Sequence, residues 1–171
     1  MTPPALFGIS VAFSFVAWAV VTRQYIWPWL RADSRADALR PILIFHSFRF
    51  IGLAFLVPGV VSPDFPQAFA RPAAYGDLAT AVLALVALAS LRNRLGTVLV
   101  WAFNILGTAD LLNAFYQGNR VGLALAPGLQ GAAFFLPTMV VPLLLITHGL
   151  VFYLLLRKQQ AAGSRMIRSA A

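Results

Sequence analysis

Apolar residues run in five long stretches along the chain, separated by short segments rich in proline, glycine and arginine. A helix needs roughly 20 mostly apolar residues to cross a bilayer, and each stretch has that length or nearly so. The stretches cover residues 5–27, 41–61, 74–91, 95–115 and 132–156. The pattern therefore predicts an all-α integral membrane bundle of five transmembrane helices, which forms a single membrane domain over residues 1–171.

Three segments lie outside these stretches. Residues 31–40, "RADSRADALR", are polar and predict a short helix lying near the cytoplasmic headgroups, with Pro41 in the first turn of the next helix. Residues 116–131, "YQGNRVGLALAPGLQG", are too interrupted by glycine and proline to span a bilayer, and they predict an outer interfacial loop or half-helix. Residues 157–171 form the predicted cytoplasmic tail.

The basic residues predict the orientation, because cytoplasmic loops of membrane proteins carry an excess of lysine and arginine. One side would hold Arg23, Arg31, Arg35, Arg40, Arg92, Arg94, Arg157, Lys158, Arg165 and Arg168, and the other only Arg71 and Arg120. We therefore expect the N-terminus outside and the C-terminus in the cytoplasm.

Composition agrees with this class. Hydrophobic residues make up 60% of the chain and charged residues 11%, whereas about a quarter of a soluble domain is charged. The net charge of +8 is concentrated between apolar stretches, which favours contact with anionic lipid headgroups and not with nucleic acid. The chain has no cysteine, so thiolate metal sites and disulfides are excluded.

Several polar residues lie within the apolar stretches, and we expect them to form a buried polar core that is also a possible ligand site. A central arginine or aspartate facing lipid costs about 3 kcal/mol even on lenient scales, so these side chains should face the bundle interior. Helical rise places them at two depths. The inner group is His46, Arg49, Asn104 and His148, and the outer group is Asp77, Asp110 and Asn113. The long side chain of Arg49 reaches toward the outer group, so Asp110 or Asp77 is its expected counter-charge.

Four quoted segments carry a resemblance to a known group of sequences. They are "HSFRFIGLAFL", "FPQAFARPAAYGD", "WAFNILGTADLL" and "PTMVVPLLLITHGL", with the pattern HxxRxxG, FAxPAxxGD, NxxGxxDL and a final histidine. Over about residues 41–156 the chain resembles a widespread, uncharacterised family of small bacterial multi-pass membrane proteins. The resemblance implies the bacterial inner membrane and a common polar core, but it implies no activity.

Three functions remain open from the sequence. The first is a non-enzymatic partner or assembly subunit that acts with another protein or a second copy. It requires no chemistry of the polar residues, whose contacts would then be only structural. A binding or permeation protein would use the paired aspartates and the histidines for a proton or a small anionic or zwitterionic solute. An electron-transfer protein would hold haem b between His46 and His148.

An enzyme is the weakest interpretation. The chain shows no nucleophile context and no phosphate loop. Two histidines without glutamate or cysteine are also a poor set of zinc ligands, so we expect no metal site.

Overall fold

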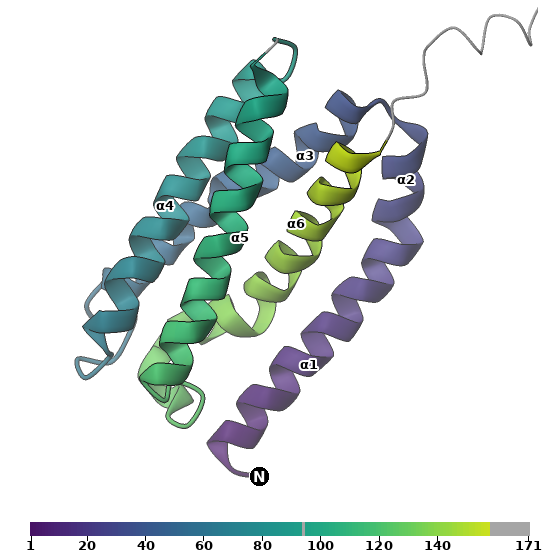
Figure 1. Ribbon diagram of the computed structural model, residues 1–171. Helices are drawn as coiled ribbons and strands as arrows, with labels where there is room; N and C mark the ends of the chain where they lie inside the picture. Colours follow the sequence, from purple (N-terminus) through teal and green to yellow (C-terminus); the bar gives the residue numbers. More distant parts are fainter. Residues whose placement is uncertain (94, 158–171) are drawn as a thin grey trace, which may run out of the picture.

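The computed structural model describes residues 1–93 and 95–157, and within them it is helical with no β-strand (Figure 1). The prediction of an all-α bundle is confirmed. Five helical stretches are long and apolar enough to cross a membrane. They are Pro3–Ala32, Arg35–Leu56, Gln67–Ser90, Gly96–Arg120 and Leu136–Leu156. The predicted tail lies outside the described residues, except for Arg157.

The first and last stretches each contain a widened turn in front of a proline. In the first, α1 (Pro3–Val21) passes through a π-helical turn, η1 (Thr22–Ile26), into α2 (Trp27–Ala32), where Pro28 follows. In the last, η4 (Leu136–Val140) is π-helical and leads into α6 (Val141–Leu156), where Pro142 follows. A proline ring clashes with the carbonyl four residues earlier, and the wider turn makes room for it.

The second stretch begins at α3 (Arg35–Ser47) and continues as a 3₁₀ helix, η2 (Phe48–Leu56). The helix starts upstream of the predicted residue 41, because Ser34 caps it by accepting a hydrogen bond from the Asp37 amide. Pro41 consequently lies inside the helix. Residues 31–40 therefore do not form a helix of their own: they hold the end of α2, the break at residues 33–34 and the first turns of α3.

The third and fourth helices are also longer than predicted. The helix α4 (Gln67–Ser90) starts seven residues before residue 74 and contains Pro72, and α5 (Gly96–Arg120) continues five residues past residue 115. Residues 116–131 thus begin as the last turns of α5. They end in a 3₁₀ helix, η3 (Pro127–Phe134).

The helix α4 lies at the centre of one half of the bundle, where it packs against α3, η2 and α5. The helix α6 packs against α5, α3 and α1, and α1 lies at the edge beside it (Figure 1). The chain begins at one end of the bundle, and α6 finishes at the other. Helices distant in the sequence therefore enclose a common interior.

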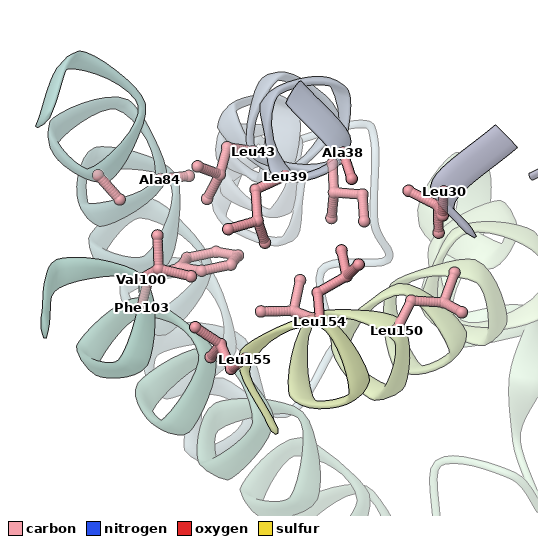
Figure 2. Close-up of a cluster of buried hydrophobic side chains, with 13 residues drawn as sticks. Leu30, Ala38, Leu39, Leu43, Ala84, Val100, Phe103, Leu150, Leu154 and Leu155 are labelled. Carbon is pink, nitrogen blue, oxygen red and sulfur yellow. The ribbon is translucent and has the colours of Figure 1, made fainter. Parts of the chain in front are cut away.

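Apolar residues fill that interior at both ends. We name the two groups the Leu154 cluster and the Phe65 cluster. The Leu154 cluster (Figure 2) joins α2 and α3 to the start of α5 and the ends of α4 and α6, and it includes Leu30, Leu39, Leu43, Val100, Phe103, Leu150 and Leu154. The Phe65 cluster lies at the opposite end and includes Phe55, Val61, Phe65, Phe69, Leu123 and Leu136. The buried polar side chains of η2, α4, α5 and α6 lie between these clusters.

Candidate functional site

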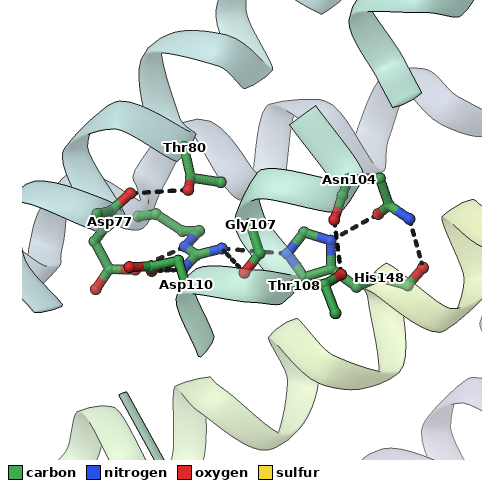
Figure 3. Close-up of polar contacts among 9 residues, drawn as sticks. Asp77, Thr80, Asn104, Gly107, Thr108, Asp110 and His148 are labelled. Atoms are coloured by element: carbon green, nitrogen blue, oxygen red, sulfur yellow. Dashed lines mark hydrogen bonds and ion pairs between the residues drawn. The ribbon is translucent and has the colours of Figure 1, made fainter. Parts of the chain in front are cut away.

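Figure 3 shows a buried polar network that includes Asp77, Asp110, Gly107 and His148. Arg49, with 2% of its surface exposed, is the centre of this network. Its Nε donates to Asp77 Oδ1 at 2.7 Å, and its Nη2 lies 2.7 Å from the same oxygen. Nη2 also donates to Asp110 Oδ2 at 2.6 Å. Nη1 donates to the Gly107 carbonyl at 3.3 Å and contacts His148 Nε2 at 3.2 Å. Four of these contacts are hydrogen bonds, and the contact between Nη2 and Asp77 is an ion pair, so every nitrogen of the guanidinium is held within the network.

Five residues of η2, α4, α5 and α6 form what we call the arginine cluster: Arg49, Asp77, Asp110, Asn104 and His148. Because an arginine side chain can only donate, His148 Nε2 must accept from it and carry no proton. The proton of the His148 ring is then on Nδ1, which lies 2.7 Å from Asn104 Oδ1. The Asn104 amide donates in turn to the His148 carbonyl at 3.3 Å. Each polar group of this histidine is thereby fixed in orientation.

Three glycines provide the space that the cluster occupies. A Cβ added at Gly52 would overlap the Asp77 carboxylate, and one added at Gly76 would overlap Asp110 Oδ1. A Cβ at Gly107 would lie 2.6 Å from His148 Cε1, closer than real Cβ atoms approach. Each of the three side chains that contact Arg49 therefore packs onto a glycine of a neighbouring helix.

His46 is fully buried and lies beside the arginine cluster. Its Nε2 is 2.9 Å from Thr147 Oγ1, and that hydroxyl donates to the Leu143 carbonyl at 2.8 Å. The hydroxyl has one proton, so when it donates to Leu143, His46 Nε2 is the donor in the shared bond. His46 Nδ1 then becomes an acceptor, and it has no hydrogen-bond partner among the described residues.

The two histidines do not fit a bis-histidine haem. Such a haem lies between its two axial imidazoles, whereas the rings of His46 and His148 contact each other directly, with centroids 4.4 Å apart. Their Nε2 atoms are also turned to Thr147 and Arg49. The part of the chain that the structure describes contains no group of three or more histidine or aspartate residues placed to hold a metal ion.

Six of the seven predicted site residues come together: His46, Arg49, Asp77, Asn104, Asp110 and His148. Asn113 does not, because it is exposed on α5. Nine residues separate it from Asn104, which at 3.6 residues per turn rotates its side chain by about 180°. The expected inner and outer groups also merge, since the long side chain of Arg49 reaches both aspartates. The sequence analysis did not identify Thr147, although a threonine beside a histidine in an apolar helix was an available signal.

A cavity of about 140 Å³ adjoins the arginine cluster. Arg49, Asp77 and Asp110 line one part of it. The remaining lining is mainly apolar and includes Phe7, Phe55, Phe69, Phe115, Leu123 and Leu136. The side chain of Arg49 is 1% exposed, but those of Asp77 and Asp110 are 18% and 11% exposed. The carboxylates of Asp77 and Asp110 are thus the more exposed side chains of the arginine cluster at this cavity.

Comparison with known families gives one match. A family model described as "Domain of unknown function (DUF8737)" matches residues 6–156. Comparisons with curated proteins and with solved structures find no match. The expected resemblance to an uncharacterised family is confirmed at this level. The match also starts earlier than the expected residue 41, so it includes the first helix.

Proposed function

Because the chain belongs to the family described as "Domain of unknown function (DUF8737)", whose description names no activity, we propose from the geometry that it is a membrane-embedded binding protein. The ligand is a small molecule held in the cavity beside the arginine cluster. The observation that carries this proposal is the exposure of two aspartate side chains, each paired with a buried arginine, to a cavity with apolar walls.

A location in the bacterial inner membrane, with the N-terminus outside, is part of the proposal. Five apolar helices of spanning length support it, as does the excess of arginine in residues 22–41 and 92–94 over the opposite ends of the helices. In this orientation the cavity belongs to the outer half of the bundle, because it lies along α5 from Asp110 to Asn119.

Binding is favoured over permeation by what lies on the other side of the arginine cluster. There the Leu154 cluster fills the interior with buried side chains from α2, α3, α4, α5 and α6. A solute that reaches Asp110 from the cavity would have to separate these helices to pass further. A site that is closed on this side suits a receptor or sensor, and transport would require a second copy or a partner.

A role as a partner subunit is a second candidate, and the position of α1 favours it. None of the residues of α1 is buried, although the helix is 19 residues long. The side of the helix that does not pack against α6 and η4 is therefore available to another membrane protein. Purification in a mild detergent tests this role: a stoichiometric complex with a second protein, lost when α1 residues such as Phe13 and Val16 are changed to charged ones, would support it.

The binding proposal is tested by native mass spectrometry of the protein purified from its own membrane. We expect a bound small molecule, and we expect Ala114→Phe to remove it, because Ala114 lines the cavity and a phenyl ring would fill that space. Ala102→Phe is the matched control, since Ala102 is exposed on the same helix. A wild-type protein without bound ligand, or one whose ligand survives Ala114→Phe, would contradict the proposal.

A further inference from the structure

The charges of the arginine cluster restrict what the cavity can bind. Arg49 contributes one positive charge, and Asp77 and Asp110 contribute two negative charges when both carboxyls are ionised, so these three residues then sum to −1. His148 is held as a neutral imidazole by its two ring contacts. The cavity therefore adjoins one negative charge that no described residue in contact with the cluster compensates.

Hydrogen bonding gives the same restriction independently of charge. An anion would need donors, but Arg49 already donates to Asp77, Asp110, Gly107 and His148, and its side chain is only 1% exposed. The polar atoms that the arginine cluster presents to the cavity are carboxylate oxygens, which only accept when ionised. The other polar residue along the cavity is Asn119, near its exposed edge. A ligand next to Asp77 and Asp110 must therefore donate.

The rest of the cavity defines the body of the ligand. Four phenylalanines, Phe7, Phe55, Phe69 and Phe115, contribute to its walls together with aliphatic side chains. Aromatic rings attract cations through their faces. The volume of about 140 Å³ is close to that of an engineered apolar cavity of about 150 Å³ that binds benzene. The space thus suits one ring or a short branched chain.

We infer that the ligand is a small organic cation: a protonated amine attached to an apolar group about the size of a benzene ring. Its ammonium group donates to Asp77 and Asp110, and its apolar part lies among the phenylalanines. This inference rests on the proposed binding function and specifies the ligand for the same site. It replaces the anionic or zwitterionic solute that the sequence suggested, because Arg49 is fully engaged.

The test uses three probes of similar shape that differ in charge: phenethylamine, 2-phenylethanol and phenylacetate. Binding to the full-length protein in nanodiscs of zwitterionic lipid is measured by isothermal titration calorimetry. We expect phenethylamine to bind about 10-fold or more tightly than the alcohol, because hydrogen bonds to charged groups are the stronger ones. We expect no measurable binding of phenylacetate.

Two variants separate the site from the membrane surface. Asp110→Asn should reduce the preference for the amine over the alcohol to less than about 3-fold, since it removes one charge that attracts the amine. Asp64→Asn removes the same charge from an exposed turn and should leave the preference unchanged. If Asp110→Asn does not fold, Ala114→Phe provides the second measure, because it should block all binding without altering the carboxylates.

The possible results distinguish this inference from the proposed function. Equal affinity for all three probes, abolished by Ala114→Phe, would overturn the inference about charge and leave the binding cavity in place. Tighter binding of phenylacetate would do the same. Failure of all three probes to bind would overturn the inference, and, if the purified protein also carries no ligand, the proposed function with it.

Discussion

Gly76→Ala should destabilise the protein far more than the loss of a glycine normally does. Gly76 lies in α4 directly against the Asp110 carboxylate of α5. An added Cβ would overlap Oδ1 and would lie 2.5 Å from Asp110 Cγ. Carbon atoms that are not bonded prefer separations of about 3.5–4.0 Å, so the carboxylate must retreat by roughly 1 Å. The other oxygen of the same carboxylate accepts from Arg49 Nη2 at 2.6 Å, and this bond would be stretched beyond hydrogen-bonding distance.

The expected cost follows from these contacts. Overpacking a dense interior costs about 1–3 kcal/mol, and breaking a buried ion pair by removing one partner costs about 3–5 kcal/mol. Here the pair is stretched and not removed, and alanine gains up to about 1 kcal/mol over glycine in a helix. We therefore expect a net loss of about 2–4 kcal/mol in the free energy of unfolding. Gly149→Ala is the control, because a Cβ at Gly149 meets nothing within 4 Å.

The assay is unfolding in mixed micelles by titration with sodium dodecyl sulfate, followed by circular dichroism. A double-mutant cycle with Asp110→Ala isolates the cause, since this substitution removes the carboxylate that the new Cβ would strike. In that background Gly76→Ala should cost less than about 0.5 kcal/mol. An equal cost in both backgrounds would refute the reasoning, because the loss could not then come from the contact between Gly76 and Asp110.

Three further substitutions can be followed by the same titration. Arg49→Lys should lower the free energy of unfolding by about 2–4 kcal/mol, because an ammonium has three donors and cannot replace a planar guanidinium that makes five contacts. An unchanged free energy of unfolding would mean that only the positive charge matters. Thr147→Val should cost about 1–3 kcal/mol by leaving His46 Nε2 without an acceptor, whereas the serine variant keeps the hydroxyl and should be close to wild type. Gly131→Ala should cost about 1–3 kcal/mol, since Gly131 has φ +50° and a Cβ there would strike the Val60 carbonyl; Gly128→Ala meets nothing and should be neutral.

The number and order of the helices could be predicted from the sequence because a long apolar run has few alternatives to a helix. Their ends could not, since an apolar run does not show where the backbone is first capped. Ser34 starts α3 within a polar segment. Pro41, which suggested a helix start, lies inside α3, and Pro72 lies inside α4. At these two positions proline marks the neighbourhood of a boundary and not the boundary itself.

The members of the polar core could be predicted because polar side chains in apolar helices must find partners inside the bundle. Their pairing could be predicted only in part. An aspartate was the expected counter-charge of Arg49, but Arg49 binds both aspartates and also His148, because its side chain reaches further than depth along a helix indicates. Asn113 was included by spacing alone, and its rotation around α5 removes it from the interior. The glycines under Asp77, Asp110 and His148 matter through contacts between helices, which a single sequence does not contain.

The excess carboxylate is the feature that a purely structural network does not explain. One aspartate would neutralise Arg49 and hold its helix against α4 or α5. A second aspartate in the same network adds a charge whose burial costs free energy unless it is paired, and that cost rises further in a bilayer. Both carboxylates are partly exposed to the same cavity, while the arginine between them is enclosed. The free-energy cost of the second carboxylate is offset only if a positively charged group from outside the cluster pairs with it. The cavity is the space in which such a group can lie.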